Sequence, residues 1–226
     1  MNHPRSLRSL WLRVLLLASL LLPAAAIQAA TERWAKEIDA LTAADATNPP
    51  PAGGVVFVGS SSIRMWNTLA TDFPGVATIN RGFGGSQLAD SVQYLDRIVL
   101  PYRPRAVVLF AGSNDIASGK TPAQVAADFK AFRTRLHAAL PETKLFFLSI
   151  NPAPSRAKIH DQFAEANALI EADCASDPRC TYVDIATPML DASGGTRPEL
   201  FLKDQLHMNA DGYAIWKRVL APYLKP

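Results

Sequence analysis

The chain has 226 residues, enough for one domain or at most two small ones, and its 49% apolar and 19% charged residues are ordinary for a globular protein with a sizeable core. Its formal net charge of +3 comes without a basic cluster interleaved with aromatic residues, so the sequence does not indicate a nucleic-acid-binding protein.

The first thirty residues have the pattern of a secretory signal peptide. Three arginines, the last of them Arg13, precede the apolar run VLLLASLLL, and Pro23 and a run of small residues follow it. A retained anchor is disfavoured, because nine apolar residues fall short of the roughly 20 that span a membrane. We predict removal of residues 1–30, with cleavage between about 26 and 30, and a periplasmic or secreted single domain over 31–226.

After the predicted signal peptide, short apolar runs alternate with helical patterns. Continuous apolar runs predict strands over 55–58, 76–79, 106–110, 145–150 and 182–185. Helical patterns lie near 31–44, 62–69, 88–100, 122–139, 155–175 and 210–223. This alternation predicts one α/β domain built as a three-layer α/β/α sandwich around a parallel sheet.

Polar segments follow the predicted strands, at the edge where ligands of such sheets bind. They are the segments 59–62, 80–86, 112–115, 151–155 and 188–209. The glycines of NRGFGGSQ do not form a dinucleotide fingerprint, because the third glycine would fall at Gln87. We therefore expect no nucleotide cofactor.

The stretch VVFVGSSSIRMW places three serines directly after the first strand. A polar turn would explain them, but one of the three could also be a nucleophile, provided that a histidine takes its proton. His137 and His160 fall on predicted helices, whereas His207 stands in a loop with Asp204 three residues before it. Asp204 and His207 can form an acid–base pair. Alternatively, they can be polar residues of the loop that precedes the last helix.

Taken together, GSSSI, NRGFGGS, GSND and DQLH resemble the four sequence blocks of the SGNH hydrolases, also called GDSL esterases and lipases. Within that family the chain looks most like the catalytic subunits of platelet-activating-factor acetylhydrolase and related bacterial esterases. The resemblance implies a flavodoxin-like sheet with strand order 2-1-3-4-5. It also implies ester hydrolysis through an acyl-serine, without metal or cofactor.

Carried over by its motifs, the resemblance implies roles for five residues. The nucleophile falls on Ser61, the acid and base on Asp204 and His207, and an oxyanion hole on Ser61, Gly85 and Asn114. The chain departs from the family at one position in this block, because Ser60 stands where the family has aspartate. That aspartate does not transfer protons, so we still expect activity.

The substrate is less clearly indicated. Met65, Trp66, Phe83 and Met208 are candidates for lining the acyl pocket, although core packing is the better explanation of each of them. The sequence has no long segment that could form a lid, which favours short-acyl esters as substrates. A carbohydrate O-acetyl ester and a lysophospholipid are the alternative substrates. A non-catalytic ligand-binding module is the alternative from another class, and the sequence indicates no oligomeric state.

The chain has two cysteines, Cys174 and Cys180. In an exported protein they are expected to form a disulfide that closes a short loop. Neither cysteine has a second ligand at a spacing that suits zinc.

Overall fold

The computed structural model describes residues 33–225, so the predicted signal peptide lies outside the described residues. The chain divides into two units, Met1–Glu37 and Ile38–Pro226. In the first unit, the Arg33 guanidinium lies 4.6 Å from the centroid of the Trp34 ring. The sheet and the site described below belong to the second unit.

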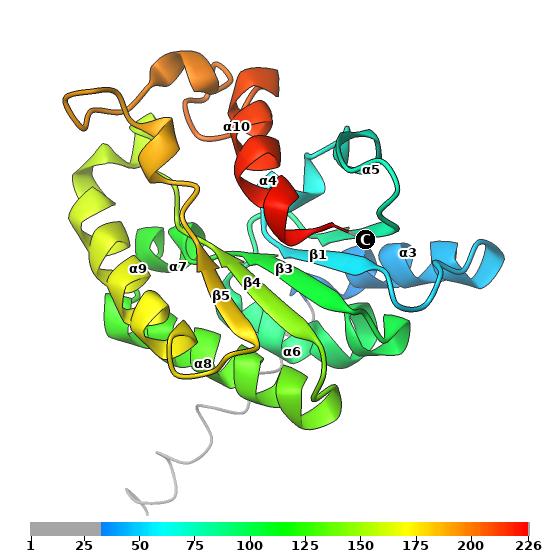
Figure 1. The fold of residues 1–226 in the computed structure, drawn as a ribbon. Coiled ribbons are helices and arrows are strands. Elements are labelled where there is room, and N and C mark those ends of the chain that lie inside the picture. Colours follow the sequence, from blue (N-terminus) through cyan, green and yellow to red (C-terminus); the bar gives the residue numbers. More distant parts are fainter. Residues whose placement is uncertain (1–32, 226) are drawn as a thin grey trace, which may run out of the picture. The chain divides into compact units, whose positions relative to one another are not determined.

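The second unit is built on a five-stranded parallel sheet (Figure 1). The strands are β1 (Val55–Gly59), β2 (Thr78–Gly82), β3 (Ala106–Phe110), β4 (Lys144–Leu148) and β5 (Cys180–Val183). Their order in the sheet is β2-β1-β3-β4-β5. The predicted α/β sandwich and its strand order are therefore confirmed.

The helices connect the strands or follow them. They are α3 (Ala35–Thr47), α4 (Ser61–Arg64), α5 (Leu69–Asp72), α6 (Leu88–Ile98), α7 (Ser113–Ala117), α8 (Pro122–Ala139), α9 (His160–Cys174) and α10 (Ala210–Leu220). Short 3-10 turns are η1 (Leu100–Tyr102), η2 (Pro154–Ile159), η3 (Thr187–Met189), η4 (Pro198–Leu200) and η5 (Ala221–Tyr223). Among the described residues, no helix combines the length and the apolar character needed to cross a membrane.

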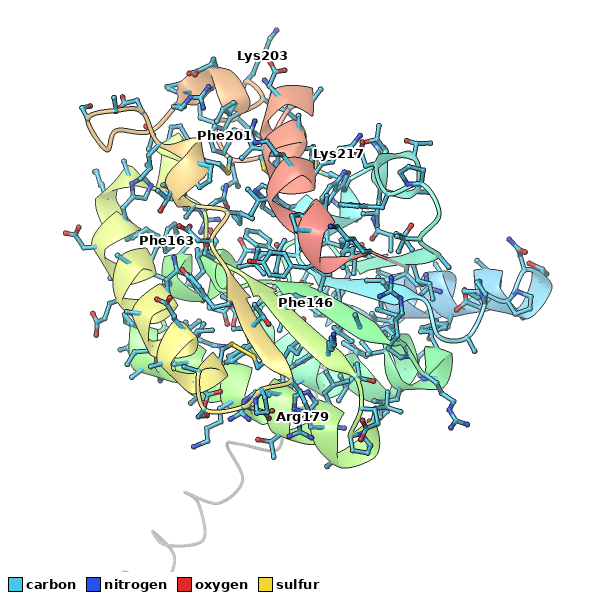
Figure 2. The ribbon with its side chains drawn as sticks, viewed as in Figure 1. Phe146, Phe163, Arg179, Phe201, Lys203 and Lys217 are labelled. Atoms are coloured by element: carbon cyan, nitrogen blue, oxygen red, sulfur yellow. A yellow bond between two sulfur atoms is a disulfide. The ribbon has the colours of Figure 1, made fainter. Side chains whose placement is uncertain are left out.

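Both faces of the sheet are covered, which explains why its strands are continuous apolar runs. Helices α4, α5 and α10 cover one face, and α6, α8 and α9 cover the other. Phe146 of β4 and Phe201, both labelled in Figure 2, belong to the apolar cluster under α10. Trp66 and Trp216 also pack in this cluster, with ring centroids 5.8 Å apart.

The end of β1 closely approaches the end of β3. Gly59 has φ = +135°, and a Cβ atom at this position would lie 1.9 Å from the Phe110 carbonyl oxygen. Any side chain would therefore push the two strand ends apart. Glycine at this position allows the chain to turn into α4 directly beside β3.

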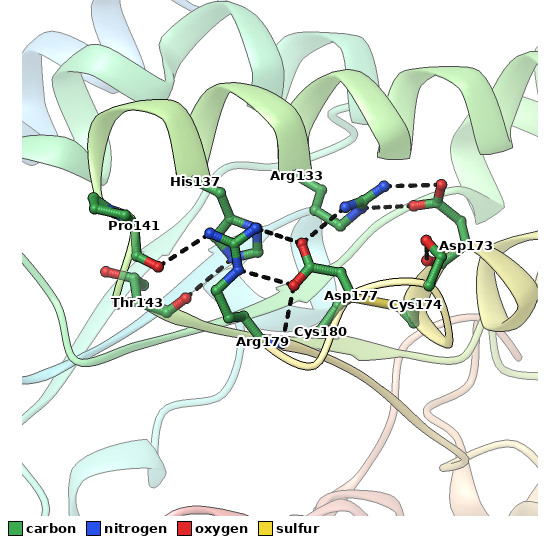
Figure 3. Close-up of polar contacts among 10 residues, drawn as sticks. Arg133, His137, Pro141, Thr143, Asp173, Cys174, Asp177, Arg179 and Cys180 are labelled. Carbon is green, nitrogen blue, oxygen red and sulfur yellow. Dashed lines mark hydrogen bonds and ion pairs between the residues drawn. A yellow bond between two sulfur atoms is a disulfide. The ribbon is translucent and has the colours of Figure 1, made fainter.

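A charged cluster lies at the other end of the sheet, where α8 and α9 meet the start of β5 (Figure 3). Asp177 is 6% exposed and accepts hydrogen bonds from Arg133 (3.0 Å) and Arg179 (2.7 and 2.8 Å). His137 Nδ1 lies 3.2 Å from the same carboxylate, and Arg133 also binds Asp173. The disulfide between the two cysteines, at residues 174 and 180, closes the loop that carries Asp177.

We expect Asp177→Ala to lower the free energy of unfolding by about 1–3 kcal/mol, since it removes the acceptor of hydrogen bonds from the Arg133 and Arg179 guanidinium groups and from the Arg179 backbone N–H. The hydrogen bonds from Arg179 hold the pKa of the Asp177 carboxyl well below its ordinary value of 3.8. A folded pKa below the unfolded one means that this stabilisation is present above about pH 4 and is lost as the pH falls further. Denaturant unfolding at pH 7 and at pH 3 measures both effects.

The matched control is Glu165→Ala, which removes an exposed carboxylate of α9 and should change stability by less than about 0.5 kcal/mol. Equal stability of the Asp177→Ala variant and the wild-type protein at pH 7 would contradict the prediction.

Candidate active site

The three serines after β1 differ in exposure. Ser60 is the N-cap of α4 and is 5% exposed, and Ser62 is 8% exposed. Ser61, the first residue of α4, is partly exposed. Of the three serines, Ser61 is therefore the most exposed to solvent.

The loop before α10 carries a histidine to Ser61. Phe201 and Met208 form an antiparallel bridge, and the Leu202 N–H donates to the His207 carbonyl (2.7 Å), which fixes the turn between them. His207 Nε2 lies 2.9 Å from Ser61 Oγ, although the two residues are 146 positions apart in the chain. A hydrogen bond of this length permits proton transfer between the two groups.

Asp204 holds the other side of the imidazole. Its Oδ2 lies 2.6 Å from His207 Nδ1, and its Oδ1 accepts the backbone N–H groups of Leu206 (2.9 Å) and His207 (3.0 Å). These bonds, the side-chain bond from His207 first, lower the pKa of Asp204 to about 2. Asp204 is therefore a carboxylate at all but strongly acidic pH, and it holds the neutral imidazole with its proton on Nδ1 and a lone pair on Nε2.

The turn that carries Gly85 lies against the end of β1. The Phe83 N–H (2.9 Å) and the Ser86 hydroxyl (3.2 Å) both donate to the Gly59 carbonyl. Gly85 has φ = +74°, a left-handed conformation that glycine adopts without strain. Within residues 33–225, neither the Ser61 nor the Gly85 N–H donates to a backbone carbonyl, so both are available to a ligand.

Asn114, on α7, is fixed at both ends of its amide. Its Nδ2 donates to the Ser86 carbonyl (3.1 Å), and its Oδ1 accepts from Arg156 Nη2 (3.1 Å). Asn114 and Ser61 line the same small cavity, whose volume is about 10 Å³. The other residues that line it are Ser60, Ser62, Phe110, Ser113, Asn151 and Leu206.

The sequence model of the GDSL-like lipase/acylhydrolase family matches residues 41–215. The chain belongs to this family. It is a carboxylic ester hydrolase. A comparison with curated protein sequences found no match.

Three solved structures share the fold of this acylhydrolase. A Streptococcus pneumoniae protein described as a candidate platelet activating factor has a TM-score of 0.75 at 20% identity, over 89% of this chain and 99% of that one. A GDSL-like lipase from Bacteroides thetaiotaomicron has a TM-score of 0.68 at 23% identity, over 85% and 96% of the two chains. An acetylxylan esterase from Geobacillus stearothermophilus has a TM-score of 0.61 at 11% identity, over 77% and 95%.

The acylhydrolase buries three of the four residues that the sequence suggested for the acyl pocket. Trp66, Phe83 and Met208 are at most 2% exposed and belong to the core, so our expectation that they contact substrate needs correction. Met65 is partly exposed, but it lines a different hollow of about 460 Å³, together with Met208 and Leu202. Large apolar side chains beside a motif are first of all core residues.

Two residues of the acylhydrolase site were not predicted. Asn151 follows β4, is 4% exposed, and lines the cavity with Ser61; its side-chain amide makes no hydrogen bond with any residue in the described range. Arg156 lies in η2 and binds Asn114. The polar segment after the fourth predicted strand was the available signal, but nothing in the sequence says which of its side chains reach the site.

Proposed function

We propose that this acylhydrolase hydrolyses short-acyl, acetyl-like esters through an acyl-serine intermediate, with Ser61 as the nucleophile and His207 as the general base. The observation that carries the proposal is the hydrogen-bonded chain from Asp204 through His207 to Ser61, with lengths of 2.6 and 2.9 Å. Asp204 would orient the imidazole and stabilise the imidazolium that forms during the reaction.

In the first half-reaction, Ser61 Oγ attacks the ester carbonyl carbon while His207 Nε2 takes the hydroxyl proton. The carbonyl electron pair moves onto oxygen and gives a tetrahedral oxyanion. When this intermediate collapses, the carbonyl re-forms, the bond to the alcohol oxygen breaks, and His207 returns its proton to the leaving alcohol. In the second half-reaction a water molecule takes the place of Ser61 as attacking group, and the acid and the free serine are released.

The oxyanion needs donors that are already in place. We assign this role to the backbone N–H groups of Ser61 and Gly85 and to the side-chain amide of Asn114. The free backbone N–H groups, and the amide held between Ser86 and Arg156, support the assignment. Ser60, in place of the family's aspartate, is buried beside the nucleophile and takes no part in these steps.

The size of the cavity supports a short acyl group. Its volume of about 10 Å³ is roughly the space that one water molecule requires, which suits the methyl group of an acetyl ester. Longer chains would have to displace Leu206 or the closely packed Phe110. We therefore place acetyl esters ahead of esters of long fatty acids.

Along a series of p-nitrophenyl esters, we expect kcat/KM to fall about tenfold or more between acetate and octanoate, because extra methylenes overpack the cavity. The Leu206→Ala variant serves as a matched test, because a larger cavity should raise butyrate and hexanoate turnover relative to acetate. A wild-type preference for octanoate would contradict the assignment of the acyl site.

A carbohydrate O-acetyl esterase is the second candidate, and Asn151 favours it. A nearly buried amide without a protein partner can bind a hydroxyl of a polar alcohol such as a sugar. The signal-peptide pattern supports an extracytoplasmic substrate, and one protein of the same fold is described as an acetylxylan esterase. Acetate release from acetylated xylan, with lysophospholipid assayed in parallel, separates this candidate from a lysophospholipase.

A further inference from the structure

The short turn η2, after β4, reaches across to α7. Its Arg156 donates from Nη1 to the Ser113 carbonyl (2.9 Å) and from Nη2 to Asn114 Oδ1 (3.1 Å). The guanidinium fork therefore binds both the backbone and the side chain of neighbouring α7 residues. Two parallel bonds from a planar fork fix direction as well as distance.

These contacts determine which way the Asn114 amide faces. An amide has an oxygen that only accepts and a nitrogen that only donates, so a half-turn about its last side-chain bond exchanges the two. Arg156 has no acceptor, and the Ser86 carbonyl has no donor. With Arg156 on Oδ1 and Ser86 on Nδ2, the exchanged orientation would put like groups together at both ends.

Orientation matters because the Ser86 carbonyl uses one N–H of Nδ2 and leaves the other for a substrate oxyanion. The exchanged amide would instead present its oxygen to the developing negative charge. Burial lowers the pKa of the Arg156 guanidinium from its ordinary value of 12.5, but an arginine stays protonated in proteins. Its positive charge also polarises the amide and strengthens the remaining N–H as a donor.

The same turn also contacts the loop that carries the base. The Ser155 N–H donates to the Gln205 carbonyl (3.0 Å), and Gln205 lies between Asp204 and His207. The turn is itself held by His160, whose Nε2 lies 2.9 Å from the Ala153 carbonyl. Arg156 thus projects from a segment that is fixed on both sides.

We propose that Arg156 is a positioning residue, which holds the Asn114 amide with its N–H toward the oxyanion. The proposal rests on the proposed function, in which Asn114 is an oxyanion donor. Arg156 does not touch the substrate; it acts on the transition state through Asn114. Its loss should therefore lower kcat and leave substrate binding almost unchanged.

The test is a double-mutant cycle on p-nitrophenyl acetate hydrolysis, with Arg156→Ala, Asn114→Ala and both together in the mature protein. We expect Asn114→Ala to lower kcat about 100- to 1000-fold and Arg156→Ala about 10- to 100-fold, with KM changed less than about threefold. In the Asn114→Ala background, Arg156→Ala should have an effect of less than about threefold, since the amide that it orients is absent.

Arg105→Ala is the matched control, because Arg105 also donates to a backbone carbonyl, that of Leu224 (3.0 Å), and is not part of the site. Its kcat should equal that of the wild-type protein. Arg156→Lys keeps the charge and a single donor nitrogen in place of the fork, and should recover part of the kcat that Arg156→Ala loses. If Arg156→Ala does not fold, as judged by circular dichroism, the lysine variant replaces it in the cycle, with a smaller loss of kcat and the same non-additivity expected.

Full kcat in Arg156→Ala, or effects that multiply in the double variant, would overturn the role of Arg156 and leave the esterase mechanism standing. An Asn114→Ala variant with wild-type kcat would remove Asn114 from the oxyanion hole and overturn the inference with it. A wild-type protein without esterase activity would overturn both the proposed function and the inference.

Discussion

Ser61→Ala is expected to lower kcat for p-nitrophenyl acetate by at least about four orders of magnitude, to a residual rate set by binding and oxyanion stabilisation alone. Alanine removes the oxygen that we propose as the nucleophile, while the short helix α4 and its buried neighbours are unchanged. Steady-state assays measure the loss, and covalent labelling with a fluorophosphonate, which requires an activated serine, should disappear in parallel.

Ser60→Ala and Ser62→Ala are the matched controls, because each removes one hydroxyl from the same turn. Both side chains are buried, and the hydroxyl that is hydrogen-bonded to His207 is that of Ser61, so both variants should keep measurable turnover and fluorophosphonate labelling. Full activity in Ser61→Ala, with activity lost in one of the neighbours, would move the nucleophile to that neighbour.

Asp204→Asn is expected to lower kcat by about 10⁴-fold at neutral pH with little change in fold. The asparagine amide can donate to His207 Nδ1, and this bond favours the imidazole form that carries its proton on Nε2. That form has no lone pair toward Ser61 Oγ and cannot accept the serine proton. The imidazolium formed during catalysis would also lose its neighbouring negative charge.

The matched control is Asp191→Asn, which changes another carboxylate that accepts hydrogen bonds within the long segment before α10. It should leave kcat unchanged. An Asp204→Asn variant that keeps more than about a tenth of wild-type kcat would show that His207 does not need this carboxylate.

The fold was predictable where local signals and tertiary packing agree. The helix predicted over 122–139 has the observed bounds. Its start could be predicted because Thr121 and Gln124 form a capping box and Pro122 occupies the first turn. The helix predicted over 62–69 is wrong: the chain forms α4 and α5, and between them Trp66 turns into the core and donates to Asp72 (2.8 Å). Helix α7 was missed, since five residues are too few for a periodic pattern.

The strand predicted over 76–79 begins two residues later and extends to Gly82. Val76 is instead part of a turn, since its N–H donates to the Phe73 carbonyl (3.1 Å). Asn80 and Arg81, which lie beyond the predicted end of the strand, are polar. A search for apolar runs therefore could not find this part of the strand. β2 lies at the edge of the sheet, where polar side chains have space: Arg81 binds Asp45 of α3.

Part of the candidate site could be predicted from the sequence because its polar residues directly follow the strands. The apolar strands make these polar segments easy to recognise. The structure brings Ser61, His207 and Asp204 into one hydrogen-bonded chain, and their catalytic roles stay predictions until the variants are measured. Asn151 and Arg156 could not be chosen from sequence, because their positions depend on how the segment after β4 crosses to α7. Trp66 and Phe83 were candidates for lining the acyl pocket because they lie beside the motifs in the sequence. Adjacency in sequence, however, does not give the direction of a side chain.

The long sequence separation between Ser61 and His207 has a consequence for biogenesis. Their hydrogen bond, and that from the Tyr213 hydroxyl to the Ser62 carbonyl (2.8 Å), form only after the C-terminal helix docks against α4. Contacts between distant segments close late during folding, because loop closure costs entropy before the contact forms. A nascent chain should therefore stay inert toward esters until α10 has been synthesised and has docked, and recovered turnover should be the last signal to return on renaturation.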